Sequence, residues 1–194
     1  MASMQKLAGL MRRAIEKYDM IQPGDRIAIG ISGGKDSMAL LMGLHQLRTY
    51  IGIPYEIVGL TLDPCFSGVQ TDYSPIAALC EQLGVEYICK RTEIGQIVFD
   101  RRAESNPCSL CARMRRACLC DEALAAGCNK IALGHHFDDA IETFIMNLFE
   151  EGRVESFQPV THLSRNQVTL FRPLVMAAEG LTSEAVHHAG LTAV

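Results

Sequence analysis

The sequence predicts an α/β fold, a doubly wound parallel sheet with helices on both faces. Two observations predict it. Short apolar segments rich in β-branched residues alternate with segments of helical periodicity. A glycine-rich turn, 30–37, joins the first of these apolar segments to the helix expected after it. The chain has 194 residues, which we interpret as a single domain, 1–194, large enough to bury a substantial core.

The first elements can be assigned in order. Apolar residues recur at helical spacing near the N-terminus and predict an amphipathic helix: Leu7, Leu10, Met11, Ala14, Ile15 and Tyr18. Pro23-Gly24-Asp25 predicts a turn. The apolar run that begins at Arg26 predicts a buried strand over 26–32.

The alternation continues along the chain, apart from a charged and less regular stretch over 91–107. Further helices are predicted over 38–50, 75–83, 109–126 and 139–149, and further strands over 55–63, 85–90, 130–133 and 167–171. We interpret 91–120 as an insertion that carries a pair of cysteines. Ligands bind such sheets at the carboxyl ends of the strands, where residues 32–37, Asp63 and 134–139 fall.

Composition narrows the class of protein. The net charge of −4 gives no overall attraction to nucleic acid, so any RNA contact must come from a local basic patch. No apolar run approaches the roughly 20 residues that cross a bilayer, and the N-terminus lacks a signal-peptide pattern. The eight cysteines therefore do not indicate a disulfide framework. We expect a soluble, cytoplasmic protein without a membrane partner.

The stretch GISGGKDS, residues 30–37, predicts a phosphate-binding loop. It fails the Walker spacing, because Ile29 and Asp36 occupy the positions of the first glycine and of the Mg²⁺-binding hydroxyl. Gly33 and Gly34 let backbone N–H groups approach an anion at the start of a helix. Asp36 suits either a helix cap or a ligand for Mg²⁺. The predicted phosphate-binding residues are Gly30, Ile31, Ser32, Gly33, Gly34, Lys35, Asp36 and Ser37.

A second polar motif, LGHHFDD, spans 133–139. His135 and Asp139 are four residues apart and could share one helix face as metal ligands. Alternatively, Asp138 and Asp139 cap the helix while the histidines lie partly buried against the sheet. The residues alone leave both interpretations open.

Cys108 and Cys111 have the C-x₂-C spacing that lets two thiolates hold one metal or cluster, and three arginines (Arg113, Arg115 and Arg116) follow them. Adding Cys118 and Cys120 makes a zinc site formally possible. Residues two apart on a helix, however, point about 200° away from each other. An iron–sulfur cluster also needs thiolates, usually four.

Three motifs resemble those of a known family. SGGKDS resembles the loop of the PP-loop ATP pyrophosphatase superfamily, and LGHHFDDAIET resembles the second signature of its tRNA-modifying members. NPCSLCARMRRA, together with Glu151-Gly-Arg153, resembles the tRNA 2-thiocytidine synthetase family. The similarity runs in order from about Leu7 to Leu174.

The resemblance implies an adenine nucleotide alpha-hydrolase-like fold and an ATP-dependent tRNA sulfurtransferase. ATP is split between its α and β phosphates, a pyrimidine carbonyl accepts AMP, and sulfur then displaces it. By the resemblance, Lys35 and Asp36 are catalytic, Asp63 and Gly134 lie near the nucleoside, and Asp139 lies near the phosphates. Asp36 and Asp139 are the implied ligands of Mg²⁺.

In that family the two cysteines of the C-x₂-C motif and a third near the C-terminus hold a [4Fe–4S] cluster, which assigns Cys108 and Cys111 as catalytic ligands. Here no cysteine follows Cys128. We therefore expect either a shortened C-terminal part that leaves the ligand set incomplete or a different residue that completes it, with zinc as the alternative metal.

Basic residues gather around the cysteine motif and predict an RNA surface: Lys90, Arg91, Arg101, Arg102, Arg113, Arg115 and Arg116. The expected partners are tRNA and a sulfur donor, such as a cysteine desulfurase or sulfide, and a homodimer is the candidate assembly. Two other hypotheses stay open. One is adenylation of a different acceptor, and the other is a non-catalytic nucleotide- or metal-binding protein.

Overall fold

The computed structural model describes residues 2–101, 107–164 and 167–191. Its α-helices are α1 (Ala2–Lys17), α2 (Lys35–Leu47), α3 (Ser74–Gln82), α4 (Ile94–Gln96), α5 (Pro107–Ala125), α6 (Phe137–Glu150) and α7 (Glu179–His188). Its strands are β1 (Arg26–Gly30), β2 (Glu56–Asp63), β3 (Glu86–Arg91), β4 (Lys130–Ala132), β5 (Val160–Leu163) and β6 (Val168–Phe171). Short helical turns lie at Phe66–Gly68, Ile97–Arg101 and Pro173–Met176.

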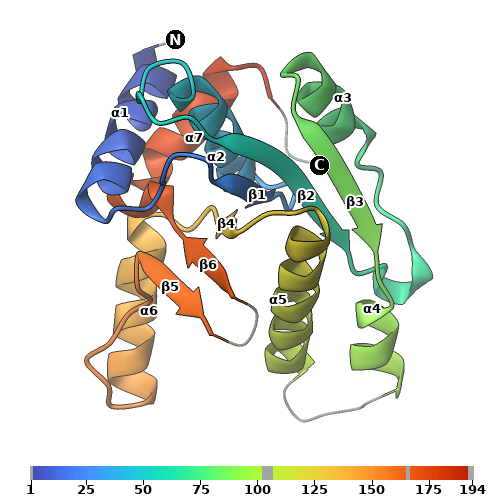
Figure 1. The fold of residues 1–194 in the computed structure, drawn as a ribbon. Coiled ribbons are helices and arrows are strands. Elements are labelled where there is room, and N and C mark those ends of the chain that lie inside the picture. The colour runs from blue at the N-terminus through green and yellow to red at the C-terminus, as the bar shows by residue number, and fades with distance from the viewer. Residues whose placement is uncertain (1, 102–106, 165–166, 192–194) are drawn as a thin grey trace.

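The strands form one six-stranded sheet in the order β3-β2-β1-β4-β6-β5 (Figure 1). Parallel pairing joins β3 through β6, with Ile29 opposite both Gly59 and Ala132 at the centre. Only β5 runs antiparallel, against β6. From β1 the chain winds outward to β3 and then returns to β4 on the other side of β1. This reversal places a topological switch point between β1 and β4, where such sheets bind ligands.

Alternate residues of the central strands enter two different cores. Ile27 and Ile29 of β1 pack with α1, α2, α3 and α7 on one face of the sheet. Ala28, between them, faces the opposite core, where Cys120 and Ala123 of α5 cover the sheet. Helices therefore lie on both faces, which confirms the predicted fold class (Figure 1).

All the predicted helices and strands are present, with ends that differ by a few residues. The sequence interpretation missed β5, which has only four residues and pairs at the sheet edge, and it assigned no element to α7. Within 91–107 the structure shows α4 and the helical turn Ile97–Arg101. The predicted insertion, 91–120, includes residues 102–106, which lie outside the described ranges. No helix in the described parts of the chain is both long and apolar enough to span a membrane.

Helix α6 differs from the others because none of its residues is buried. Its exposed large apolar side chains are Phe137, Ile141, Phe144, Ile145, Met146, Leu148 and Phe149. In Figure 1 it stands at the edge of the molecule, beside the β5–β6 pair.

Candidate active site

A cavity of about 450 Å³ opens at the switch point between β1 and β4. Its lining comes from β1 and the loop after it, from β2, from the segment after β4 and from α5. The lining residues are Gly30, Ile31, Ser32, Asp36, Ser37, Leu60, Leu62, Ala112, Arg115, Arg116, Leu119, Leu133, Gly134, His135, Asp139 and Leu170. Apolar walls with polar groups converging at one end are typical of a nucleotide-sized site.

The predicted phosphate loop forms one end of this cavity. Ser37 Oγ donates to the carbonyl of Gly34 at 2.8 Å and accepts from the N–H of Ser32 at 3.3 Å, which closes the loop on itself. Gly33 has φ +89°, a conformation that favours glycine. Gly34 is the N-cap of α2 and has no side chain to cover the first N–H groups of the helix. These N–H groups and the helix dipole make an anion site.

Gly134 brings the end of β4 against the start of α2. A Cβ at this position would lie 3.1 Å from the backbone carbon of Asp36 and 3.2 Å from the nitrogen of Ser37. Glycine at residue 134 lets the end of β4 approach the start of α2 this closely, because any side chain there would press on backbone atoms.

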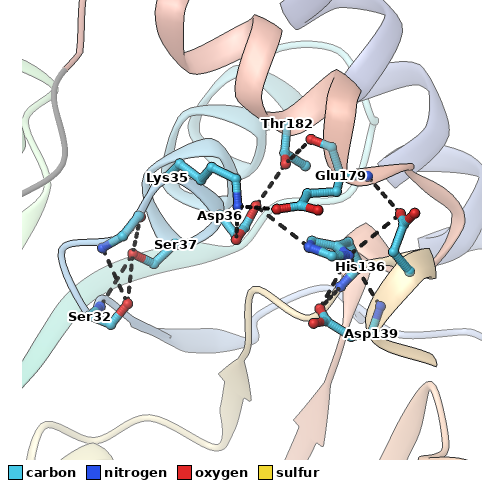
Figure 2. Close-up of polar contacts among 10 residues, drawn as sticks. Ser32, Lys35, Asp36, Ser37, His136, Asp139, Glu179 and Thr182 are labelled. Carbon is cyan, nitrogen blue, oxygen red and sulfur yellow. Dashed lines mark hydrogen bonds and ion pairs between the residues drawn. The ribbon is translucent and has the colours of Figure 1, made fainter. Parts of the chain in front are cut away.

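Lys35 and Asp36 belong to a polar network behind the loop (Figure 2). Lys35 Nζ lies 3.1 Å from Asp36 Oδ2 and 2.7 Å from Glu179 Oε1. The hydrogen bond with Glu179 contributes most to raising the pKa of Lys35, which keeps the side chain charged. Asp36 lines the cavity, whereas Lys35 is not among the lining residues.

The structure decides between the two interpretations of residues 133–139. Because α6 begins at Phe137, His135 lies before the helix and does not share a face of it with Asp139. Asp139 Oδ2 instead accepts from the N–H of His136 at 2.7 Å, and Asp139 N–H donates to His136 Nδ1 at 3.3 Å, a reciprocal cap. Asp138 accepts from the N–H of Glu179 at 2.7 Å. Asp139 therefore caps α6 together with His136, whereas Asp138 caps α7 instead, and Asp139 also faces the cavity.

His135 and His136 occupy different environments. His136 is buried behind the loop. His135 lines the cavity, and its ring centroid lies 5.3 Å from that of Phe157. Desolvation lowers the pKa of His135, and the positive charge of Arg172 acts in the same direction.

Asp63 is the last residue of β2, and its carboxylate is bound by backbone N–H groups of the following loop. Its carboxylate accepts from the N–H of Cys65 at 3.0 Å and from that of Thr71 at 3.1 Å. The residue is buried and is not among those that line the cavity. In this structure Asp63 orders the loop after β2, and its contact with a nucleoside stays a prediction.

The cysteines of α5 divide between two faces of the helix. Cys111 and Cys118 are half-buried against Ile94 and Val98. Cys108 is exposed and lies one turn before Ala112, which lines the cavity. Cys120 belongs to the core beneath the sheet. The eight thiols are all unpaired.

The positions of these cysteines limit which of them can bind a metal or cluster. Burial raises the pKa values of Cys118 and Cys120, which favours neutral thiols over metal-binding thiolates. Cys108 and Cys111 are adjacent on the helix surface, but no group of three potential ligands gathers within the described ranges. The described residues thus supply two ligands of a cluster and do not complete the set.

The arginines after the cysteine motif lie on the walls of hollows. Arg115 and Arg116 line the main cavity. Arg116 also lines a second hollow of about 370 Å³ between α5 and β5, and Arg113 and His162 line this second hollow alone. Of the other predicted basic residues, Lys90 pairs with Glu122 at 2.8 Å, and Arg102 lies outside the described residues.

Comparison with known proteins agrees with this geometry. Residues 5–191 match the PP-loop domain family. The chain belongs to the PP-loop family. Within it, the tRNA-cytidine(32) 2-sulfurtransferases of Syntrophotalea carbinolica and Geobacter sulfurreducens are 37% and 38% identical to the chain, over 98% and 90% of its length. The alignments cover 73% and 68% of those relatives, which confirms the predicted tRNA 2-thiocytidine synthetase-like family.

Solved structures show the same PP-loop fold. The U34-tRNA thiolase NcsA from Methanococcus maripaludis, solved with its [4Fe–4S] cluster, superposes with a TM-score of 0.75 and 25% identity. The match covers 95% of this chain and 63% of NcsA, so the chain spans less than two thirds of that neighbour's length. An FMN adenylyltransferase from Candida glabrata, with a TM-score of 0.52 and 14% identity, shares the fold alone.

Proposed function

We propose that this PP-loop protein is an ATP-dependent tRNA sulfurtransferase that acts on the 2-carbonyl of a cytidine, position 32 in the named relatives. One observation carries the proposal. The phosphate loop and α5, the helix with Cys108 and Cys111, line one and the same cavity. A single pocket thus combines an anion site for ATP with the element that bears sulfur chemistry.

The chemistry divides into two displacements. The carbonyl oxygen of the base attacks the α-phosphorus of ATP, the bond from that phosphorus to the oxygen bridging to the β-phosphorus breaks, and pyrophosphate leaves. A sulfur nucleophile then attacks the adenylated carbon, and the carbon–oxygen bond breaks with release of AMP. The N–H groups at the start of α2 and the ammonium of Lys35 stabilise the charge that builds on departing pyrophosphate.

Asp36 and Asp139 fit Mg²⁺, because both are carboxylates that face the cavity beside the phosphate loop. When bound there, the ion would neutralise phosphate charge. The chain's own contribution is to hold the two carboxylates in place, Asp139 through the α6 cap and Asp36 through contacts with α7.

We propose Cys108 and Cys111 as two ligands of the [4Fe–4S] cluster that the resemblance implies; both are on α5, although neither is among the residues that line the cavity. NcsA, the structural neighbour, holds such a cluster. No step of the reaction is assigned to it here, because the described residues do not complete its ligand set.

Arg113, Arg115 and Arg116 are proposed to bind tRNA phosphates along the two hollows, where they are exposed and the rest of the chain is acidic. Sulfide or a cysteine desulfurase is the proposed sulfur source, and the cytoplasm the proposed compartment. We also propose a homodimer, supported by the exposed apolar face of α6. Ile145→Glu on that face is then expected to convert dimer into monomer in light scattering, whereas a wild-type monomer would contradict it.

The function is tested by measuring pyrophosphate release with and without tRNA transcripts. Wild-type protein is expected to release pyrophosphate faster when a tRNA with an unmodified target cytidine is present. Lys35→Ala should abolish this stimulation by weakening phosphate binding, while Lys6→Ala, an exposed lysine of α1, should not change it. Release of pyrophosphate that is independent of tRNA would contradict the proposal.

A further inference from the structure

Helix α7 places two side chains against the phosphate loop, although 146 residues separate Thr182 from its partner Asp36. Thr182 Oγ donates to Asp36 Oδ1 at 2.7 Å. Glu179, one turn earlier, reaches Lys35 Nζ at 2.7 Å. Figure 2 shows both side chains reaching from α7 to the residues at the start of α2. Neither is among the residues that line the cavity.

The contact of Thr182 is built into the core. Thr182 is fully buried, with 0% exposure. Its one hydroxyl hydrogen has two acceptors in reach, Asp36 Oδ1 and the carbonyl of Glu179 at 2.8 Å. A carboxylate is the stronger acceptor, so the hydroxyl fixes Asp36 Oδ1.

The same oxygen faces His136. His136 Nδ1 accepts from the N–H of Asp139, so in the neutral ring the proton is on Nε2, which lies 3.9 Å from Asp36 Oδ1. One carboxylate oxygen of Asp36 thus accepts a hydrogen bond from buried Thr182 and lies near the ring of buried His136. The other, Oδ2, contacts only the ammonium of Lys35 among the described polar contacts.

Glu179 limits how strongly Lys35 competes for that second oxygen. The ammonium lies closer to Glu179 Oε1, at 2.7 Å, than to Asp36 Oδ2, at 3.1 Å. The backbone of Glu179 is held in turn, because its N–H donates to Asp138 at the start of α6. The starts of α2, α6 and α7 are therefore joined in one polar network.

We propose that Thr182 and Glu179 are positioning residues for the ATP site: Thr182 orients Asp36 so that Oδ2 faces Mg²⁺, and Glu179 draws Lys35 away from that oxygen. The proposal rests on the proposed function, since it takes Asp36 as a ligand of Mg²⁺ bound with ATP. Helix α7 thus acts in Mg²⁺-dependent binding of ATP, although none of its residues is among those that line the cavity.

The test is calorimetric binding of α,β-methylene ATP, which cannot be cleaved between the α and β phosphates, over a titration of Mg²⁺. Thr182→Val keeps the shape of the side chain and removes the donor. The Mg²⁺ concentration for half-maximal binding is expected to rise about tenfold, as for loss of a hydrogen bond to a charged group. Thr182→Ser, which keeps the hydroxyl, should restore the wild-type value. Affinity without Mg²⁺ should not change.

Two further variants test whether the effect on the Mg²⁺ requirement is specific to the contacts between α7 and the phosphate loop. Thr49→Val removes an exposed hydroxyl just beyond the far end of α2, where Thr49 Oγ donates to the carbonyl of Gln46, and should leave the Mg²⁺ requirement unchanged. Glu179 is exposed, so Glu179→Gln is expected to fold, and it should raise the Mg²⁺ requirement about threefold because Lys35 then turns to Asp36.

The outcomes separate the two proposals. Wild-type Mg²⁺ requirements in Thr182→Val and Glu179→Gln would overturn the positioning roles and leave the ATP site intact. Thr182→Val with a lower unfolding midpoint but an unchanged Mg²⁺ requirement would show a purely structural contact. Absence of α,β-methylene ATP binding to the wild type at any Mg²⁺ concentration would overturn the proposed function and this inference together.

Discussion

Gly134→Ala tests whether the close approach of β4 to the phosphate loop is required for ATP binding. The added Cβ would lie 3.1 Å from the backbone carbon of Asp36, 3.2 Å from its oxygen and 3.2 Å from the nitrogen of Ser37. Ordinary contacts between heavy atoms begin near about 3.5 Å, so the two segments must separate by roughly 0.4 Å. The neighbours are backbone atoms, which cannot rotate away as a flexible side chain would.

This displacement acts on the N–H groups proposed to hold the phosphates. Overpacking of this kind costs about 1–3 kcal/mol in unfolding free energy, and a shift of a few tenths of an ångström at the site predicts roughly tenfold weaker ATP binding. Calorimetry with α,β-methylene ATP and urea unfolding measure the two effects. Gly9→Ala is the matched control, since nothing lies within 4 Å of a Cβ there and α1 should become more stable. Wild-type ATP affinity in Gly134→Ala would refute the reasoning.

Three other predictions concern the core, the pH dependence and the cysteines. Tyr55→Phe removes a buried hydrogen bond to the carbonyl of Leu44, at 2.7 Å, and should lower the unfolding free energy by about 1 kcal/mol in urea titrations, with ATP affinity unchanged. Burial opposes ionisation of Asp25, but hydrogen bonds led by that from Lys130 outweigh it and lower the pKa of Asp25. The stabilisation from the ionised Asp25 carboxylate is present at neutral pH and is lost as pH falls below about 4. Asp25→Asn should therefore show a smaller decrease in unfolding free energy between pH 6 and 3 than the wild type. An equal decrease in both proteins would count against this role of Asp25. Cys108→Ala should lower the iron content of anaerobically purified protein and leave ATP binding unchanged, and an unchanged iron content would remove Cys108 from the ligands.

The sequence predicted the strand, glycine turn and helix start at one end of the cavity because their determinants are local, and ATP binding by these residues stays a prediction. A strand, a glycine turn and a helix start lie within residues 26–37, and their order alone indicates an anion site. The expected parallel sheet and the family resemblance predicted that Gly134 and Asp139 would meet this loop, and both lie on the cavity wall. The use of Asp63 by the loop after β2 could not be predicted, because the sequence does not show which backbone N–H groups fold back onto a carboxylate.

The contacts of α7 with the phosphate loop are the clearest feature of the site that could not be predicted from the sequence. Thr182 and Glu179 meet the loop only through tertiary packing of α7 against α2, and nothing in the spacing of the chain relates them to Lys35. An acidic residue at the start of a helix, as at Glu179, is most simply explained by the helix dipole. β5 escaped prediction for a similar reason, because a four-residue strand owes its existence to its partner β6.

The central claim, that the oxygen of a tRNA base attacks the α-phosphorus of ATP, is tested most directly by running the reaction in ¹⁸O-labelled water. ATP, Mg²⁺, sulfide, tRNA and anaerobically purified protein are combined, and the AMP and the nucleosides of the tRNA are analysed by mass spectrometry. The account predicts unlabelled AMP in equal amount to a thiolated cytidine, with pyrophosphate as the other product. AMP that carries ¹⁸O from water, or the appearance of ADP and phosphate in place of AMP, would contradict it.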